Sequence, residues 1–196
     1  MQIIVLATSN NGKLLEIRNI LENIPFEIKS SMELGFHNEI AETGKSFREN
    51  AKIKAETVGK KLKILTLAED SGLEVDALSG KPGIYSARYV EGSDSDRVNK
   101  ILEDLKNVPK EKRTARFFCV AALYDPVLDK TEFFAGESRG LITEKPVGKN
   151  GFGYDPIFYN FDLKKTNSES SLEEKNRVSH RARALIKVKE FLLSEH

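Results

Sequence analysis

A short apolar run and two adjacent carboxylates stand together in Ile64-Leu65-Thr66-Leu67-Ala68-Glu69-Asp70-Ser71-Gly72. The apolar part, residues 64–68, predicts a short buried strand. Ligands of α/β proteins bind at the carboxyl ends of strands, and Glu69 and Asp70 follow this one directly. Neighbouring carboxylates repel each other unless a raised pKa or a cation such as Mg²⁺ relieves them. The pair therefore predicts either a metal site or an acidic turn in which Asp70 or Ser71 caps a chain reversal.

Strands and helices alternate on both sides of this stretch. Apolar patterning predicts strands at residues 3–8, 26–29, 64–68, 73–75, 114–124, 130–142 and 157–159. Helical spacing and capping signals predict helices at residues 14–24, 46–61 and 93–106, and a last one that Ser179 caps. Asp125-Pro126 separates the two longest strands and indicates an antiparallel hairpin. The chain is therefore expected to form an α/β fold, with a mixed twisted sheet flanked by helices.

The composition excludes several classes of protein. The chain has 196 residues, with 31 basic and 30 acidic side chains and a net charge of +1, which fits one domain or one compact body with two lobes. Proteins that coat nucleic acid or bind membrane surfaces usually carry a clear basic excess, so neither partner is expected. A site for an anion must therefore be a local cluster of cations.

The expected compartment is the cytoplasm. No apolar run approaches the roughly 20 residues of a membrane span, and residues 3–7 are too short for the apolar part of a signal peptide. The single cysteine, Cys119, lies in an apolar run and is interpreted as a buried small side chain rather than a nucleophile. One cysteine forms no disulfide within the chain, which fits a reducing compartment.

The first candidate site for an anion is Thr8-Ser9-Asn10-Asn11-Gly12-Lys13, where a predicted strand meets a predicted helix. Free backbone N–H groups at such a turn bind phosphate, and a lysine adds positive charge. The alternative is simple capping of the helix by Ser9 or Asn10.

The second candidate combines Glu42 with Lys54. Glu42 lies in a loop before a predicted helix, on which Asn50 and Lys54 share one face. Glu42 could complete a metal shell begun at Asp70, and Lys54 could then reach a phosphate oxygen. The alternative is a solvated loop and an ordinary surface lysine.

Two further candidates lie near the end of the chain. Phe152 stands in a glycine-rich loop, Phe152-Gly153-Tyr154-Asp155-Pro156, where a ring could stack on a base or plug the loop. Lys175 and Ser179-His180-Arg181 place cations near the predicted start of the last helix, which disfavours cations unless an anion binds there. The alternative is a charged surface run. Together the candidates supply the parts of a site for a nucleoside polyphosphate.

Five separated motifs carry a resemblance through almost the whole chain. They lie at residues 7–13, 42–51, 69–78, 82–89 and 151–158, and are joined by Glu16, Lys54-Ala55, Glu174-Lys175 and Ser179-His180-Arg181. In this order they resemble the inosine/xanthosine triphosphate pyrophosphatases, the Ham1-like family. Asn11 stands where a small, variable residue is usual in the family, and this difference is expected to be harmless.

The resemblance implies hydrolysis of ITP, dITP and XTP to the monophosphate and pyrophosphate, which cleanses the nucleotide pool of deaminated purines. It also implies dependence on Mg²⁺, with Mn²⁺ as a substitute, and a homodimer. The implied fold is an elongated α/β fold of two lobes within a single domain, residues 1–196, with the active site in the cleft between the lobes.

The resemblance also implies roles for individual residues. Glu42 and Asp70 would hold Mg²⁺, with Glu69 as an additional or water-mediated ligand. Asp70 would activate the attacking water, and Lys54 would be the second catalytic residue, since its charge offsets that of the phosphate oxygens. The residues implied to bind substrate are Thr8, Ser9, Asn10, Asn11, Gly12, Lys13, Ser71, Phe152, Gly153, Tyr154, Asp155, Lys175, His180 and Arg181.

Within that set, Phe152 would stack on the base, with Asp155, His180 and Arg181 around its edge. Donors from His180 or Arg181 would satisfy the 6-oxo group of hypoxanthine or xanthine and would face the amino group of adenine unfavourably. GTP shares the 6-oxo group, so its rejection needs another cause.

Three other functions compete with this interpretation. One is a related pyrophosphatase acting on modified pyrimidines, dTTP or UTP. The second is a nucleotide sensor without catalysis, which would be expected to lack one of Glu42, Glu69 and Asp70, all of which are present. The third is an RNA-binding module, which the balanced charge disfavours.

Overall fold

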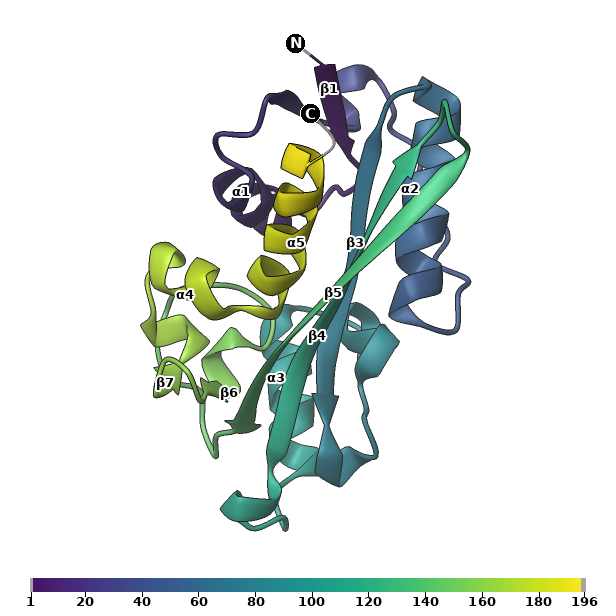
Figure 1. Cartoon of the computed structure of the whole chain (residues 1–196). Helices are drawn as coiled ribbons and strands as arrows, with labels where there is room; N and C mark the ends of the chain where they lie inside the picture. Colours follow the sequence, from purple (N-terminus) through teal and green to yellow (C-terminus); the bar gives the residue numbers. More distant parts are fainter. Residues whose placement is uncertain (1, 195–196) are drawn as a thin grey trace. The chain divides into compact units, whose positions relative to one another are not determined.

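Seven strands form one mixed sheet in the computed structural model, which describes residues 2–194. They are β1 (Gln2–Leu6), β2 (Phe26–Ser30), β3 (Thr66–Val75), β4 (Thr114–Asp125), β5 (Lys130–Ile142), β6 (Phe158–Asn160) and β7 (Lys165–Thr166). Their order is β2-β1-β3-β4-β5-β6-β7 (Figure 1). β1 pairs in parallel with β2 and β3, whereas β6 pairs antiparallel with β5 and β7. The prediction of a mixed sheet flanked by helices is confirmed.

Five α-helices accompany the sheet within the described residues: α1 (Asn11–Ile20), α2 (Phe47–Leu62), α3 (Asp94–Asp104), α4 (Leu172–Val178) and α5 (His180–Ser194). Short 3₁₀ turns are η1 (Met32–Leu34), η2 (Asp76–Leu78), η3 (Gly83–Arg88), η4 (Lys110–Lys112), η5 (Asp155–Ile157) and η6 (Asn167–Glu169). Between residues 2 and 194, no helix is both long and apolar enough to cross a membrane.

The chain divides into two compact units, each built from segments that are distant in sequence. The described part of unit 1 comprises residues 2–70, 119–136 and 181–194, and unit 2 comprises residues 71–118 and 137–180. β3, β4 and β5 each contribute residues to both units. The single domain and the cleft between lobes stay predictions.

Unit 1 has three layers. α1 and α5 cover one face of its strands, where Ile17 and Leu185 pack with Leu67 of β3. α2 covers the other face, where Ala51 packs in the same cluster as Ala68. Figure 1 shows α1 and α5 on one side of β3 and α2 on the other. Successive residues of a strand point to opposite faces, so Leu67 and Ala68 enter different cores.

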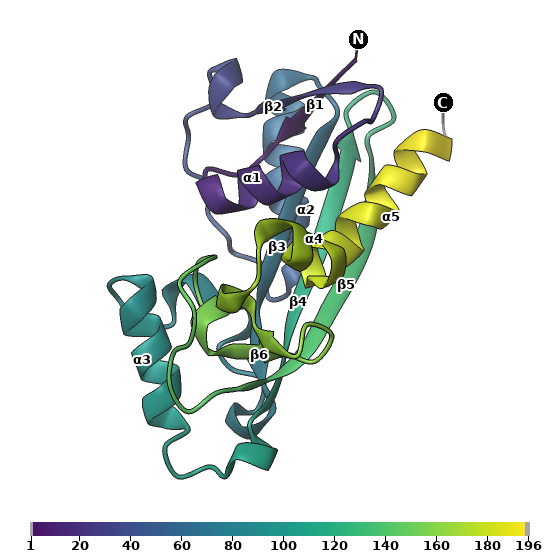
Figure 2. The same cartoon turned by 90° about the vertical axis from the view of Figure 1, so that its left-hand side faces the viewer.

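Unit 2 has a core of its own. Leu73 and Val75 of β3 pack with Ile101 of α3 and with Phe117 and Phe158. The short elements β6, β7 and α4 follow one another in this part of the chain. Figure 2 shows β6 and α4. Tyr154, which stands in the same glycine-rich loop as Phe152, belongs to this core.

Two helices match their predicted starts, and one ends early. Ser46 and Ser93 cap α2 and α3 as predicted, since each side chain accepts a hydrogen bond from the backbone N–H three residues on. α1 ends at Ile20 rather than near Pro25, because Asn23 adopts a positive φ of 66° that a helix does not continue through.

One other prediction about the elements is wrong. The predicted break after Ala68 is absent, since β3 runs without interruption from Thr66 to Val75 and holds both carboxylates in its middle. A short helix that was not predicted, α4, contains Lys175, and Ser179 stands directly before α5, at the position predicted for its cap.

Candidate active site

Glu69 and Asp70 lie on opposite faces of one buried strand. Both are buried, with 2% and 5% of their surface exposed. Because side chains alternate along a strand, Glu69 shares the face of Leu67, toward α1 and α5, and Asp70 shares the face of Ala68, toward α2. Each carboxylate therefore has its own partners.

Asp70 contacts two residues of α2, and one of them also binds Glu42. The ammonium Nζ of Lys54 lies 3.2 Å from Asp70 Oδ1 and 2.7 Å from Glu42 Oε1. Asn50 Nδ2 donates to Asp70 Oδ2 at 3.1 Å. Asn50 and Lys54 reach the same carboxylate because residues four apart share one face of a helix. One lysine thus joins a loop carboxylate to a strand carboxylate.

The loop that carries Glu42 is fastened by Asn50. Asn50 is fully buried, and its Oδ1 accepts a hydrogen bond from the backbone N–H of Gly44 at 2.9 Å. A Cβ at Gly44 would lie 2.7 Å from that oxygen, so a larger residue would break the contact. Asn50 therefore holds the Glu42 loop and Asp70 in one arrangement.

Charge and burial act in opposite directions in this cluster. Burial raises the pKa of Asp70, the cations Lys54 and Lys13 lower it, and the neighbouring carboxylates Glu42 and Glu69 raise it, with a net increase. Burial lowers the pKa of Lys54, but Asp70 and Glu42 raise it, so the net shift is upward. Lys54 therefore stays charged, while Asp70 binds a proton more readily than an exposed aspartate does.

Glu69 binds two cations on the other face. Lys13 Nζ lies 2.8 Å from Glu69 Oε1, and Arg181 Nη2 lies 3.2 Å from the same oxygen. Arg181 also pairs with Glu16 of α1. The Sγ of Cys119 lies 3.5 Å from Glu69 Oε2, and Cys119 is fully buried, as predicted. A buried network thus links α1, β3 and α5.

These cations keep Glu69 ionised. Burial raises the pKa of Glu69, but Arg181, Lys13 and Lys54 together lower it by more, so the pKa lies well below its ordinary value. Burial lowers the pKa of Arg181, and Glu69 and Glu16 raise it to a higher net value. The buried Cys119 thiol has a raised pKa, chiefly through burial, and is not a ready nucleophile.

The turn between β1 and α1 has the geometry of a helix N-terminus at a strand end. Asn10 caps α1, since its Oδ1 accepts from the backbone N–H of Lys13 at 3.0 Å, so the capping interpretation holds for Asn10. Ser9, Asn10 and Asn11 are exposed, and Thr8 and Gly12 are partly buried. Capping uses one N–H and leaves others of the first turn to face an anion.

A second cluster lies in unit 2, around Asp155 of η5. Its Oδ2 accepts from the backbone N–H of Phe152 at 2.9 Å and from Lys175 Nζ at 2.5 Å. The same Nζ lies 4.7 Å from the centroid of the Phe152 ring, a cation–π contact. Lys175 and Phe152, predicted to bind phosphate and base, are thus joined through Asp155.

The remaining predicted residues are distributed as follows. The His180 ring stacks on Phe117 with centroids 4.7 Å apart. Tyr154 is buried and donates its hydroxyl to the backbone oxygen of Ser86 at 2.8 Å. Gly153 donates its N–H to Asp94 at 2.7 Å, and Ser71 is a partly buried residue of β3 in unit 2. Their predicted contacts with substrate stay predictions.

The donors that fit a hard cation are Glu42 and Asp70. Within residues 2–194, no three His, Cys, Asp or Glu side chains are arranged to hold one metal ion. Strand alternation explains this, since it turns Glu69 away from Asp70 toward Lys13 and Arg181. Two carboxylates that share one ammonium, one of them with a raised pKa, fit Mg²⁺, which prefers oxygen ligands. Glu69 as a ligand stays a prediction.

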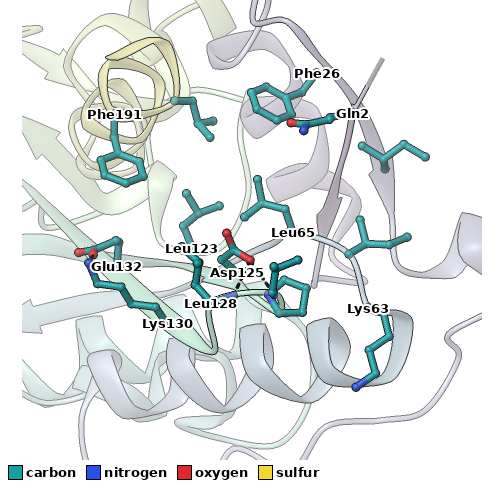
Figure 3. A pocket seen from close by; sticks show the side chains of 15 residues that line it. Gln2, Phe26, Lys63, Leu65, Leu123, Asp125, Leu128, Lys130, Glu132 and Phe191 are labelled. Carbon is teal, nitrogen blue, oxygen red and sulfur yellow. Dashed lines mark hydrogen bonds and ion pairs between the residues drawn. The ribbon is translucent and has the colours of Figure 1, made fainter. Parts of the chain in front are cut away.

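A separate cavity of about 620 Å³ lies elsewhere in unit 1. Its wall is mostly apolar, and Leu65, Leu123 and Phe191 belong to it (Figure 3). None of the predicted site residues lines it. Asp125 accepts from the backbone N–H groups of Val127 and Leu128, so its charge serves the turn between β4 and β5.

Sequence reasoning gave no role to three residues that organise the two clusters. The sequence places Asn50 on the same helix face as Lys54 and assigns it no role, although an asparagine inside a helix indicates that its side chain has a hydrogen-bonding task. Glu16 belonged to a motif, but its partner Arg181 is 165 residues away. Asn167 donates a hydrogen bond to Asp155, but it stands in a polar stretch with no periodic pattern.

Comparisons with known proteins show which family the chain is similar to. The sequence profile of the Ham1 family matches residues 4–191. A protein of Bacillus subtilis (strain 168) named dITP/XTP pyrophosphatase is 47% identical over 190 residues, which cover 96% of each chain. Ham1 proteins of Coxiella burnetii and Staphylococcus aureus have solved structures that match with TM-scores of 0.90 and 0.88, at 39% and 40% identity, over 100% of both chains. This chain belongs to the Ham1 family.

Proposed function

We propose that this chain hydrolyses dITP, ITP and XTP to the nucleoside monophosphate and pyrophosphate, and so removes deaminated purines from the nucleotide pool. The name and near-complete coverage of the Bacillus subtilis relative support this activity. The observation that carries the proposal is the convergence of Glu42 and Asp70 on Lys54, beside the cations of the Glu69 network.

Glu42 and Asp70 would hold Mg²⁺, with Mn²⁺ as a substitute. The bound ion would neutralise negative charge on the triphosphate and on the leaving pyrophosphate. Asn50 keeps the two carboxylates together, since it binds Asp70 directly and the Glu42 loop through Gly44. Glu69 would act from the opposite face, where it fixes the position of Lys13.

Asp70 is the proposed general base. One carboxylate can both hold the metal and accept the proton when the water lies on or beside the metal. The water oxygen attacks the α-phosphorus, its proton passes to Asp70, and the bond from that phosphorus to the bridging oxygen breaks. Pyrophosphate leaves with the electron pair. Lys54 and Lys13 offset the charge that builds on the phosphate oxygens, the main demand of phosphoryl transfer.

The triphosphate would lie against the turn Thr8–Lys13, whose exposed N-terminal groups face solvent. Phe152 would stack on the base, and His180 would donate to its 6-oxo group. Such a donor disfavours ATP, because its 6-amino group would leave a buried donor without an acceptor. Arg181 acts through Glu69 and Glu16, which bind its guanidinium.

The chain is proposed to act as a cytoplasmic homodimer of single-domain subunits. Light scattering on the purified protein tests this, because a monomer mass would contradict it.

The deciding experiment measures pyrophosphate release from ITP, dITP, XTP, GTP, ATP and dTTP at equal concentration, with and without Mg²⁺. Release from ITP, dITP and XTP that depends on Mg²⁺ is expected. Release mainly from dTTP, or release of orthophosphate, would contradict the proposal. Asp70→Asn should remove the activity. Asp125→Asn is the matched control, since that carboxylate only caps a turn and the amide oxygen still accepts its two hydrogen bonds.

A further inference from the structure

Four polar side chains form a buried chain of hydrogen bonds in unit 2. Ser138, Asp155, Asn160 and Asn167 are each 2% exposed or less. Asn160 Nδ2 donates to Ser138 Oγ and to Asn167 Oδ1, both at 3.1 Å. Asn167 Nδ2 then donates to Asp155 Oδ1 at 3.0 Å. Buried polar groups are costly unless each one is paired, so this chain behaves as one network.

The direction of these hydrogen bonds is fixed at one end. The backbone N–H of Asp162 donates to Asn160 Oδ1 at 3.0 Å, and a backbone N–H can only donate. The oxygen of the Asn160 amide therefore faces Asp162, and its nitrogen faces Asn167. The amide oxygen of Asn167 must therefore accept the hydrogen bond from Asn160, and the amide nitrogen of Asn167 then faces Asp155.

Asp155 passes this orientation on to two residues of the candidate base site. Its Oδ1 is held by Asn167, and its Oδ2 binds the N–H of Phe152 and the ammonium of Lys175. The backbone of Gly151 lies close against this carboxylate, since a Cβ at Gly151 would lie 2.2 Å from Asp155 Oδ2. The φ of Gly151 is +79°. A rotation of the Asp155 carboxylate would move both the Phe152 loop and Lys175.

We propose that Asn167 is a positioning residue for recognition of the nucleobase, acting through Asp155 on Phe152 and Lys175. The inference rests on the proposed function, in which Phe152 stacks on the base. Asp155 is then committed to holding these two groups and does not itself read the edge of the base. Lys175 belongs in this proposal to the base site, because its ammonium contacts the Phe152 ring and Asp155, and not to the phosphate site that the sequence predicts for it. The effect of Asn167 is therefore confined to ligands that carry a base.

Asn167→Asp tests this with almost no change in size. It replaces the donor facing Asp155 by a second acceptor, and loss of a hydrogen bond to a charged group should raise KM for ITP by about tenfold. kcat should change much less than KM. Inhibition by inorganic tripolyphosphate, which has no base, should keep its inhibition constant. Asn167→Ala, which removes the donor without adding a carboxylate, should give the same pattern and serves if Asn167→Asp does not fold.

Ser138→Ala is the matched control. It removes a buried hydrogen bond at the far end of the same network and leaves the contacts of Asp155 intact. Its KM for ITP should equal that of the unaltered protein. An equal rise of KM in Ser138→Ala, or an equal loss of tripolyphosphate binding in Asn167→Asp, would show a general effect on folding and overturn the proposal.

A fluorescence measurement separates this inference from the proposed function. The chain contains no tryptophan, so Phe152→Trp creates a single reporter in the loop. If its emission does not respond to IMP or ITP, the proposed role of position 152 fails, and this inference with it. If it responds, adding Asn167→Asp should weaken IMP binding about tenfold and increase quenching by acrylamide. An unchanged response in the double variant would overturn the role of Asn167 alone.

Discussion

Glu69 and Asp70 are adjacent in sequence and differ in charge behaviour because a strand sends them to different faces. Glu69 meets Lys13 and Arg181, and its pKa falls well below the ordinary value. Asp70 shares Lys54 with Glu42, and its pKa rises. Environments that shift the pKa values of two carboxylates in opposite directions allow them different tasks, which fits the proposal that Asp70 acts in the chemistry and Glu69 fixes Lys13.

Asp70→Asn should abolish hydrolysis without loss of stability. The raised pKa means that the folded protein binds this proton more tightly than the unfolded chain. Without metal, stability therefore falls as pH rises from the ordinary aspartate range through the raised pKa, and the loss persists at neutral pH. An asparagine carries no such charge, so its melting temperature at pH 7 should equal or exceed that of the unaltered protein.

Thermal unfolding from pH 4 to pH 8, together with ITP turnover, checks this prediction. Turnover close to that of the unaltered protein would remove Asp70 from the mechanism. A much lower melting temperature at pH 7 would contradict the cost assigned to its burial.

Arg181→Met should destabilise the protein strongly. It leaves the buried carboxylates Glu16 and Glu69 without their shared cation, which costs about 3–5 kcal/mol. The pKa of Glu69 is lower in the folded protein than in the unfolded chain, so its ionised carboxylate stabilises the fold at pH values above the ordinary glutamate pKa. This stabilisation is lost as the pH falls through the pKa of the folded state. Without Arg181 that pKa rises, so acid unfolding should begin at a higher pH.

Urea unfolding at pH 7 and an acid titration followed by circular dichroism measure these two effects. Adding Glu16→Gln to Arg181→Met should restore part of the stability, because Glu69 keeps Lys13. Equal stability of Arg181→Met and the unaltered protein would show that the network contributes nothing.

At the scale of elements, α2 is the support of the proposed metal site. Ser46→Ala removes the cap of the helix that carries Asn50 and Lys54, and should cost about 1 kcal/mol. kcat should fall as well, since both residues lie in the first two turns. Ser93→Ala is the control, because it uncaps α3, which carries no residue proposed to bind phosphate or metal.

Melting temperatures and kcat of the two variants give the test. The two losses of stability should be similar, about 2–4 °C each. If kcat fell equally in Ser93→Ala, the fall of kcat would be caused by the general loss of stability and not by the loss of the α2 cap.

The elements show where sequence reasoning succeeds and where it fails. Local signals predicted the starts of α2 and α3, because a cap is made by residues three positions apart. They failed at β3, because two carboxylates after an apolar run form the sequence pattern of a turn, whereas the strand continues through them. What allows the strand to continue is Lys54 on one face and Arg181 on the other, and partners so distant in sequence leave no local pattern. The motifs grouped Glu42, Lys54 and Asp70, which lie together in the structure, but they did not show which face of β3 each carboxylate occupies.

At the scale of the whole molecule, unit 1 depends on α5. Leu185, Val188 and Leu192 are buried in its core, at roughly 1.5–3 kcal/mol each, and Arg181 adds the network. A chain that stops after Ser179 should therefore lose the fold of unit 1, because the loss approaches the typical total stability of a domain.

Amide NMR and limited proteolysis of the truncated chain measure this loss. A chain that stops after Leu192 is the control and should stay folded, since it keeps the buried residues of α5. Native-like protection of α1 and β1 in the shorter chain would contradict the dependence on α5.

The distance in sequence between Glu69 and Arg181 also bears on how the protein is made. A ribosome must add 112 residues after Glu69 before Arg181 exists, which takes roughly ten seconds at the usual speed of translation. During that time the apolar sides of β1, α1 and β3 lack the helix that covers them, and nascent unit 1 offers a target for chaperones. Capacity to hydrolyse triphosphates arises only after this delay, however early the carboxylates proposed to act in catalysis are synthesised.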